Sequence, residues 1–374
     1  MQQDTFFASL AKHFEDKLPF VAYRKPNEMA VQAVLQSSDE LFYVNDFTES
    51  GFVFAPFNAD EPTILFPMAN SEKLELAIFE ATTETTIKAT TTVTEEEQQK
   101  HIDLVAEGVA ALQKEADFKK VVLSRKEVLQ TKDFDALVVF QKLLATYDSA
   151  FCYVWFHPKV GLWLGATPET LLQVYRNKFA TMALAGTQKF EGSTEVEWGT
   201  KEQEEQQIVT DSIVAELQKV TDNLKISAAH THKAGNLLHL KTDISGFLPA
   251  NFNAFKEVVL ALHPTPAVCG LPKERAKDFI LNNEHYTRTF YSGFLGEINK
   301  AETIERNTNR RNVENSAYKA SASSSHLFVN LRSMEVVNEE VHLFVGGGIT
   351  AASNPEAEWE ETVHKTGTMK KVLF

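Results

Sequence analysis

The chain has 374 residues, of which 43% are hydrophobic, so it is long enough to bury a large core in one big domain or two ordinary ones. Lys and Arg total 37 against 51 Asp and Glu, and the net charge of −14 argues against nucleic acid or an anionic membrane as the main partner. An anionic small-molecule substrate would therefore need a local positive site.

Two cysteines, Cys152 and Cys269, each stand in apolar sequence, which predicts buried thiols in a reducing compartment. Residues 1–20 lack a basic stretch followed by a long apolar run, and no segment approaches ~18 uninterrupted apolar residues. These features predict a cytoplasmic protein without a membrane partner.

Residues 1–80 alternate short apolar runs with polar breaks, which predicts antiparallel strands with one helix near each end. A helix beginning at Glu95 is expected next, because Thr94 and Glu97 form a T-x-x-E capping box before an amphipathic run. From Phe118 onward, alternating aromatic segments mix with helix-like ones without a strict βαβ rhythm. This mixture predicts an α+β fold of large antiparallel sheets covered by helices.

Residues 299–325 form a polar segment with several arginines and a serine run between two expected strands. We expect a loop here, and a loop of that length can serve as a lid. No stretch rich in Pro, Gly and Ser forces a division of the chain.

The segment after the glycines 346–348 carries the clearest sign of chemistry. Glu358, Glu361 and Lys365 fall at i, i+3 and i+7, so a helix beginning at Pro355 places two carboxylates and an ammonium on one face. The glycine-rich turn expected before this helix can present backbone N–H groups to an anion.

Glu202 and Glu205 form a second carboxylate pair with i, i+3 spacing on an expected helix. Two helices that each offer an acid pair can converge on one divalent cation. Oxygen ligands favour Mg²⁺ or Ca²⁺ over zinc, because no His or Cys accompanies them at ligand spacing. The alternative is that both pairs belong to solvated helix faces.

Two further residues sharpen the expected anion site. Arg332 belongs to the expected strand FVNLR, and His263 lies in the compact run LHPTPAVCGLP. A cation on a strand next to a helix N-terminus can clamp a carboxylate. The alternatives are a surface ion pair for Arg332 and a satisfied core histidine for His263.

Lys120 and Glu169 are the candidate base and acid. Alternation in KKVVLSR places Lys120 and Val121 on opposite strand faces, so Lys120 either enters a pocket as a general base or opens an edge strand. Thr167 and Pro168 predict a helix N-cap and a first helical residue. Glu169 therefore either complements a helix dipole or acts as a general acid at the end of GLWLGA.

Seven motifs occur in order along the chain: KVVLSR, LGATPETLL, LAGT, KEQEEQQIVTD, LHPTPAVCGLP, FVGGGITAASNP and EWEETVHK. Their order and spacing resemble the chorismate-utilising enzymes, most closely isochorismate synthases, from about Glu95 to the C-terminus. The resemblance implies a single chorismate-binding domain over 1–374, in which 1–94 is less clearly matched and 95–374 carries the motifs. It also implies two large antiparallel β-sheets packed face to face, with helices outside and the active site between the sheets.

The same resemblance implies a reaction and a metal. Lys120 is expected to activate water for attack at C2 of chorismate, and Glu169 is expected to protonate the departing C4 hydroxyl. Mg²⁺ is expected to neutralise one substrate carboxylate. Its direct ligands would be Glu205 and Glu361, and its waters would be held by Glu202 and Glu358.

The substrate-binding residues that the resemblance implies come from several motifs. Arg332, Lys365 and the backbone around two glycines are expected to receive the second carboxylate. The full expected set is Ala185, Gly186, Thr187, His263, Tyr291, Arg332, Gly347, Gly348 and Lys365.

Two positions favour water as the nucleophile. Relatives that use ammonia carry Gln where this chain has Lys120, and aminodeoxychorismate synthases carry a nucleophilic Lys where it has Ala185. No glutamine amidotransferase subunit is therefore expected. The departures from the family pattern are Ala183, where proline usually precedes LAGT, Gln206, where His often follows the metal-binding Glu, and the long polar loop.

Two alternatives stay open. A salicylate synthase also keeps the base lysine but goes on to eliminate pyruvate from isochorismate. A non-catalytic protein that binds a metal and a dicarboxylate would carry the same helices without needing the base or the acid. The choice between menaquinone and siderophore biosynthesis is not decided by the sequence.

Overall fold

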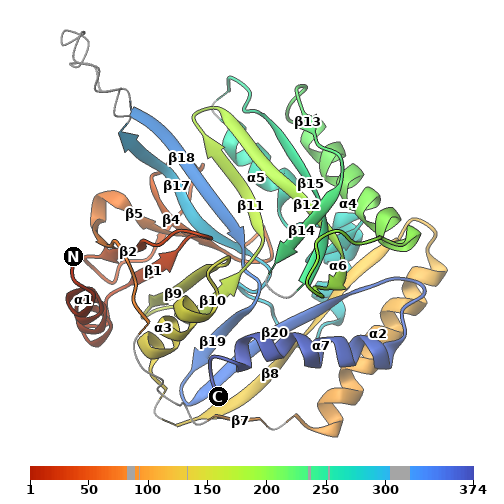
Figure 1. Cartoon of the computed structure of the whole chain (residues 1–374), viewed down its shortest axis with the longest axis horizontal. Helices are drawn as coiled ribbons and strands as arrows, with labels where there is room; N and C mark the ends of the chain where they lie inside the picture. Colours follow the sequence, from red (N-terminus) through yellow and green to blue (C-terminus); the bar gives the residue numbers. More distant parts are fainter. Residues whose placement is uncertain (82–88, 92, 133, 235–236, 252, 304–320) are drawn as a thin grey trace.

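The computed structural model describes residues 1–374 except 82–88, 92, 133, 235–236, 252 and 304–320. In that part the chain forms two large antiparallel sheets packed face to face with helices outside, which confirms the predicted fold class (Figure 1). None of the helices described there is long and apolar enough to cross a membrane.

The first sheet contains the strand that begins with Lys120. Its strands are β1 (Phe20–Arg24), β2 (Val31–Gln36), β6 (Ser71–Leu76), β7 (Ala89–Thr91), β8 (Lys120–Thr131), β9 (Phe151–His157), β10 (Gly161–Thr167), β16 (Gly270–Leu271), β19 (Ser333–Val337) and β20 (Glu340–Ile349). They lie in the order β16-β8-β20-β19-β10-β9-β1-β2-β6, and β7 pairs with β8.

The second sheet contains the LAGT motif. Its strands are β3 (Phe42–Tyr43), β4 (Gly51–Ala55), β5 (Ile64–Pro67), β11 (Thr170–Tyr175), β12 (Lys178–Lys189), β13 (Lys225–Ile226), β14 (His230–Ala234), β15 (Leu237–Phe247), β17 (Phe294–Thr303) and β18 (Ser321–Val329). They lie in the order β13-β15-β12-β11-β18-β17-β4-β5-β3, and β14 pairs with β15.

Large aromatic side chains fill the space between the two sheets. Trp155 of the first sheet packs on Phe54 of the second with ring centroids 4.8 Å apart, and Phe151 stacks on Phe328 at 4.2 Å. All four are buried, so this layer joins the sheets by apolar burial and aromatic contact.

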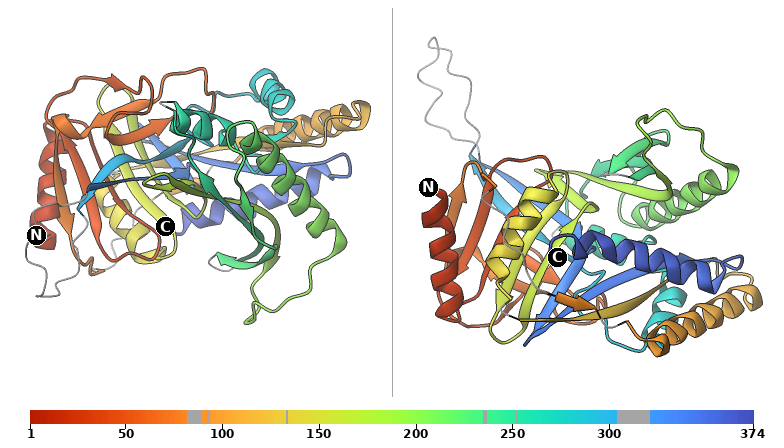
Figure 2. Two further views of the ribbon diagram at one scale, coloured as in Figure 1. Left: turned by 90° about the horizontal axis from the view of Figure 1, so that it is seen from above. Right: turned by 60° about the horizontal axis from the view of Figure 1, so that its bottom comes forward.

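The helices cover the outer faces of the sheets (Figure 2). They are α1 (Gln3–Glu15), α2 (Glu95–Lys114), α3 (Ala136–Thr146), α4 (Thr200–Gln218), α5 (Ala254–Leu262), α6 (Lys273–Asn283), α7 (Pro355–Lys370) and the short 3₁₀ helix η1 (Met68–Asn70). α1 and α3 share a core with the first sheet, and α4 and α5 share one with the second. α2 and α6 pack around the start of β8, and α7 contacts both α2 and β20.

The predicted helix starts on either side of the site-bearing strands are confirmed. Thr94 Oγ1 accepts from Glu97 N at 3.2 Å, and the Glu97 carboxylate accepts from Thr94 N at 2.9 Å, which is the expected capping box of α2. Asn354 caps α7 by accepting from Ala357 N at 2.8 Å.

Three local predictions are wrong. The glycines 346–348 lie inside β20, not in a turn, and a Cβ on Gly346 would approach Leu123 O of β8 to 2.8 Å. No helix begins at Pro168, because Thr167 ends β10 and donates to Val329 O at 2.6 Å instead of capping a helix. Arg332 follows the end of β18 in a bend, with φ of 49°, and is not part of a strand.

Two further expectations change in the structure. The polar segment 299–325 is strand at both ends, because β17 runs to Thr303 and β18 begins at Ser321, and 304–320 lie outside the described residues. Lys120 does not open an edge strand, because β8 lies between β16 and β20. Both cysteines are buried, as predicted.

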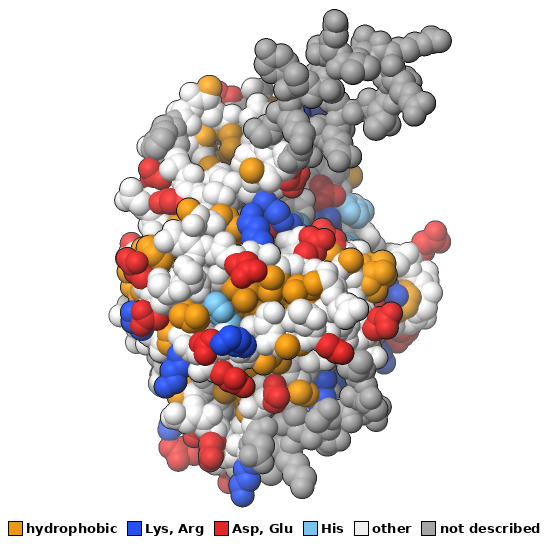
Figure 3. All heavy atoms as spheres, turned by 90° about the vertical axis from the view of Figure 1, so that its left-hand side faces the viewer, with side chains coloured by type: hydrophobic (Ala, Val, Ile, Leu, Met, Phe, Trp, Pro, Cys, Tyr) orange, Lys and Arg blue, Asp and Glu red, His pale blue; other side chains and the backbone are white. Residues whose placement is uncertain are grey.

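The surface agrees with the composition on the face that Figure 3 shows. Acidic and basic side chains interleave there with hydrophobic ones, and no single continuous basic area is seen on that face. A binding site for an anion therefore has to be sought in a hollow with local positive charge.

Candidate active site

A cavity of about 110 Å³ lies against the first sheet, at the start of β8 and the second half of β20. Its walls come from β8, β20, α7, the loop between α5 and β16, the turn after α6 and the segment after β18. The lining residues that matter for chemistry are Val122, Val268, Tyr291, Arg332, Gly346 and Lys365.

Lys120 begins β8 beside this cavity, on the same strand face as the lining residue Val122. Its side chain is 12% exposed, and its Nζ donates to Glu205 Oε1 of α4 at 2.8 Å. A Cβ on Gly348 would lie 2.8 Å from Lys120 Cε, so the lysine occupies space that any other residue at 348 would fill. The glycine run thus makes room for the candidate base.

Glu169 lies in the short connection between β10 and β11 and is 8% exposed. Burial raises the pKa of Glu169 to about 7, while a hydrogen bond from Thr265 Oγ1 at 3.3 Å and the charge of Lys120 act in the opposite direction. The carboxyl group is therefore protonated to a large extent near neutral pH. A neutral acid beside a lysine is a suitable pair for proton transfer in both directions.

Arg332 and Lys365 supply the positive charge of the cavity. Burial lowers the pKa of Arg332, and the nearby Tyr291 and Glu361 oppose that shift, but a guanidinium stays charged at any physiological pH. Lys365 Nζ donates to Gly346 O at 3.0 Å and pairs with Glu361 at 2.5 Å. The two predicted carboxylate-binding cations therefore line one cavity.

The backbone of β20 next to Lys365 is partly open. β19 pairs with β20 only as far as Leu343, whereas β8 pairs with β20 up to Ile349. In the described residues, alternate backbone groups of 346–348 therefore face the site and not a second strand. The open groups are those of Gly346, whose carbonyl accepts from Lys365, and of Gly348, which suits the predicted contact of Gly348 with an anion, whereas the backbone of Gly347 faces β8.

The LAGT motif lies near the end of β12, close to α4. Ala185 is buried, Gly186 has φ of 65°, and a Cβ on Gly186 would lie 3.2 Å from Glu202 Cβ. Gly186 therefore permits the close approach of α4 that brings Glu202 to this strand. The side chain of Thr187 lies outside the described residues.

Sequence reasoning passed over His239 of β15, which belongs to this region. Its Nδ1 lies 3.0 Å from Gly186 O. Burial lowers the pKa of His239, and so do the charges of Arg332 and Lys365. The available signal was the alternation in LLHLK, which directs His239 to the face opposite Leu238 and Leu240.

The two other predicted substrate contacts differ in position. Tyr291 is 3% exposed, lines the cavity and stacks on Phe344 with ring centroids 5.3 Å apart. His263 is buried at the end of α5, where its Nε2 lies 3.0 Å from Pro56 O and burial lowers its pKa to about 4. These are the contacts of a neutral core histidine.

The carboxylates expected to bind Mg²⁺ come from the predicted helices α4 and α7. A Cβ on Gly347 would lie 3.2 Å from Glu358 Oε2, so Glu358 reaches the glycine strand from α7 as Glu205 reaches Lys120 from α4. Carboxylate oxygens from two helices are a donor set that suits Mg²⁺. In the described part of the chain, however, no group of three or more His, Cys, Asp or Glu side chains is gathered closely enough to hold a metal ion.

In the structure, a lysine binds each of the two carboxylates that are expected to bind the metal directly. Glu205 is paired with Lys120, and Glu361 is paired with Lys365. The residues thus fit Mg²⁺ in their chemistry, and metal binding would require both carboxylates to exchange a lysine for the cation.

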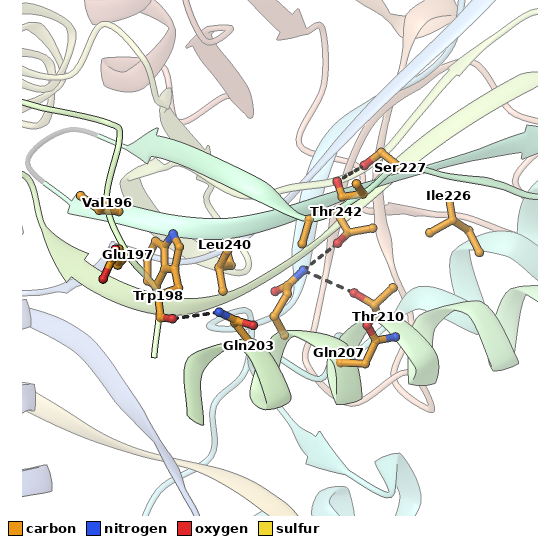
Figure 4. A pocket seen from close by; sticks show the side chains of 13 residues that line it. Val196, Glu197, Trp198, Gln203, Gln207, Thr210, Ile226, Ser227, Leu240 and Thr242 are labelled. Atoms are coloured by element: carbon orange, nitrogen blue, oxygen red, sulfur yellow. Dashed lines mark hydrogen bonds between the residues drawn. The ribbon is translucent and has the colours of Figure 1, made fainter. Parts of the chain in front are cut away.

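A larger hollow of about 670 Å³ lies on the other side of the second sheet, between α4 and the β13–β15 edge (Figure 4). Gln206, where the family pattern often has His, lies at its wall. Its Nε2 donates to Ala183 O and Thr242 Oγ1, both at 3.1 Å, so Gln206 fixes α4 to β12 and β15. We assign this residue a structural role.

Comparisons with known proteins show related sequences and a related fold. The sequence model of the chorismate binding enzyme family matches residues 59–306, and a second model of the same description matches 317–371. The chain is 28% identical over 277 residues to isochorismate synthase EntC of Escherichia coli. It is 27% identical over 278 residues to the salicylate biosynthesis isochorismate synthase of Pseudomonas aeruginosa.

These matches cover 71% and 72% of this chain but only 64% and 53% of the two relatives, respectively. Among solved structures, that of the menaquinone-specific isochorismate synthase MenF from Escherichia coli superposes with a TM-score of 0.77 at 20% identity. That superposition covers 95% of this chain and 89% of the other. The likeness shows a shared fold.

Proposed function

The chain belongs to the chorismate-binding enzyme family, and on that premise we propose that it is an isochorismate synthase that converts chorismate to isochorismate. One observation carries the proposal. A buried carboxyl group, Glu169, whose pKa is raised to about 7, lies within electrostatic reach of Lys120, which stands two residues before the lining residue Val122 of a cavity that two further cations line. This set provides an acid, a base and a site for a dianion.

The proposed reaction adds water at C2 of the ring and removes the hydroxyl group at C4. Lys120 accepts a proton from the attacking water, and Glu169 donates a proton to the departing C4 oxygen. An ammonium group has no lone pair, so Lys120 must first give up a proton, and its ion pair with Glu205 favours the charged form. Lys120 can therefore serve as the base only after the Lys120–Glu205 pair has opened and the ammonium group has lost a proton.

The cations account for how a protein of charge −14 takes up a dianion. Arg332 and Lys365 would bind one substrate carboxylate together with the open backbone groups of β20. Glu205 and Glu361 would hold Mg²⁺ directly, with Glu202 and Glu358 bonded to its waters. When bound, Mg²⁺ supplies the positive charge that neutralises the other carboxylate.

Product analysis tests the proposal. The protein is incubated with chorismate and Mg²⁺ near neutral pH, and the products are separated by chromatography. We expect isochorismate to accumulate as a reversible mixture with chorismate, without salicylate. Salicylate and pyruvate forming in equal amounts at the rate of chorismate loss would identify a salicylate synthase instead, and unchanged chorismate would favour a non-catalytic protein.

The pathway is a finer question. The names of the relatives include both menaquinone-specific and salicylate biosynthesis enzymes. We propose only that the product is isochorismate, which can be consumed in either kind of pathway.

A further inference from the structure

A buried ion pair that the proposed reaction does not use lies directly behind the cavity. The side chains of Arg288 and Glu284 are 2% and 1% exposed, respectively. Arg288 Nε donates to Glu284 Oε2 at 2.8 Å, and its NH2 group donates to Glu284 Oε1 at 2.6 Å. The guanidinium also lies over the Phe57 ring, 4.5 Å from its centroid.

The remaining donors of Arg288 reach two carbonyl groups on different segments. NH2 donates to Val122 O at 2.7 Å, and NH1 donates to Val268 O at 2.8 Å. Both of these valines line the cavity. One planar group therefore fixes two walls of the candidate active site relative to each other.

One of these walls carries the proposed base, and the other carries the residue that donates a hydrogen bond to the proposed acid. Val122 lies two residues after Lys120 on β8, and Val268 lies three residues after Thr265, whose hydroxyl group donates to Glu169. The backbone of the loop also bonds to itself at this point, because Val268 N donates to Thr265 O at 3.1 Å. A shift of Val268 would therefore move Thr265 as well.

Glu284 extends the same contact to the next residues of β8. Its Oε1 accepts from Ser124 N and from Ser124 Oγ, both at 2.8 Å, and Ser124 Oγ lies 2.7 Å from the hydroxyl oxygen of Tyr286. The pairing of β16 with β8 covers only Gly270 and Leu271. The side-chain network thus holds the part of β8 that lies past that short pairing.

Stability alone is a poor reason for burying these charges, because a buried ion pair often contributes nothing over an apolar pair of similar size. A better reason for burying Arg288 is that its guanidinium group donates to two carbonyl groups on different segments at once. We propose that Arg288 is a positioning residue that sets the spacing between Lys120 and Glu169 by joining the strand of the base to the loop that supports the acid. This inference rests on the proposed function of both residues.

The test removes both charges together, because removing only one would leave an unpaired buried charge and could unfold the protein. In the double variant Glu284→Gln/Arg288→Met, the Gln oxygen can still accept from Ser124. We expect kcat to fall about 10- to 100-fold, since small displacements of reacting groups have effects of this size. The chorismate KM should stay within about twofold, because the carboxylate-binding cations are untouched. The urea midpoint of unfolding should stay close to that of the wild type.

Arg288→Lys separates geometry from charge. An ammonium group keeps the ion pair but cannot donate to Glu284 and to both carbonyls in the fork geometry, so kcat should fall here too. The matched control is Glu115→Gln/Arg275→Met. It removes an ion pair between α6 and the end of α2, whose two N–O distances are 2.8 and 2.7 Å and which lies away from the cavity residues named above. This control should keep wild-type kcat.

Amide hydrogen exchange gives a readout that does not require the reaction. If the fork holds the loop, residues 264–272 should exchange at least about 10-fold faster in the double variant than in the control. Unchanged exchange, full turnover in Arg288→Lys, or a stable double variant with wild-type kcat would overturn the inference. A wild-type protein that forms no isochorismate in the same assay would instead refute the proposed function.

Discussion

At Glu169, burial has a stronger effect than the neighbouring charge. The Lys120 ammonium and the Thr265 hydroxyl group both favour the ionised carboxylate, yet the pKa of Glu169 is raised from 4.5 to about 7. The site thereby keeps a proton available on one carboxyl group while Glu205 of α4 and Glu361 of α7 are paired with lysines. Environment therefore assigns different roles to residues of the same type.

Glu169→Gln should remove most turnover, by about 10²- to 10⁴-fold in kcat, because the amide cannot donate a proton to the leaving hydroxyl. In the wild type, turnover that depends on the protonated acid should decline as pH rises through about 7. The measurement is the pH–rate profile of both proteins. Near wild-type turnover in Glu169→Gln at neutral pH would show that the assigned role is wrong.

The same substitution should stabilise the fold at high pH. The folded state binds the Glu169 proton more tightly than the unfolded state, so wild-type stability is fully present below about 4.5 and falls as pH rises to about 7. The free energy lost is about 3 kcal/mol at the upper end. Urea unfolding at pH 5 and pH 8 should therefore show Glu169→Gln gaining far more on the wild type at pH 8 than at pH 5. An equal difference at both pH values would contradict the raised pKa.

Lys120→Ala should lower turnover by about 10²- to 10⁴-fold with the fold intact, since it removes the base. Lys119→Ala is the matched control, because Lys119 precedes Lys120 on the chain, is exposed and has a side chain that bonds only to the carbonyl of Ala116 among the described contacts, while its backbone bond to Leu271 O survives the substitution. Steady-state kinetics and circular dichroism compare the two variants. Similar turnover in both would mean that Lys120 is not the base.

At the scale of elements, two helices that pack on different sheets each direct a glutamate side chain toward the candidate site. α4 lies on the second sheet and reaches Lys120 through Glu205, and α7 lies along β20 and reaches Gly347 through Glu358. Between the helices, Gly347 of β20 leaves room for the side chain of Glu358, and Gly348 leaves room for that of Lys120. In the structure each expected direct ligand is neutralised by a lysine, so metal binding and opening of these ion pairs should be coupled.

Chelation should abolish activity, and Mg²⁺ should restore it. Glu361→Ala should weaken Mg²⁺ binding at least about 10-fold and chorismate binding with it, because the metal is the counter-charge of the substrate. Glu360→Ala, an exposed neighbour on the same helix, should leave both unchanged. Isothermal titration calorimetry with Mg²⁺ alone and then with chorismate measures both effects. Full activity in chelator, with no metal found by elemental analysis, would overturn the metal assignment.

For the whole molecule, the sequence was sufficient for the fold class and for the helices that carry charge. The Thr94–Glu97 capping box predicted α2, and the spacing of Glu358, Glu361 and Lys365 predicted α7, because these signals act between residues that are close in the sequence. The motif order predicted two packed antiparallel sheets. Lys120 and Glu169 were selected as a pair from the resemblance, and the structure places them within electrostatic reach of each other.

What the sequence could not supply depends on contacts between distant segments. The glycines 346–348 looked like a turn because glycine usually marks one, whereas here they let Lys120 and Glu358 approach β20. Glu284 and Arg288 lie in a stretch as polar as a surface loop, and only their i, i+4 spacing hinted at a pair. Their burial and the two carbonyl contacts follow from tertiary packing, which no local pattern encodes.

The most direct test of the central claim is the source of the oxygen atom at C2 of the product. The reaction is run with chorismate and Mg²⁺ in H₂¹⁸O, and isochorismate is isolated at early times for mass spectrometry. If water activated by Lys120 adds at C2 while the C4 hydroxyl leaves, each new isochorismate molecule carries one ¹⁸O at C2. Isochorismate without label would mean that the hydroxyl group is transferred within the substrate, and it would contradict the proposed roles of Lys120 and Glu169.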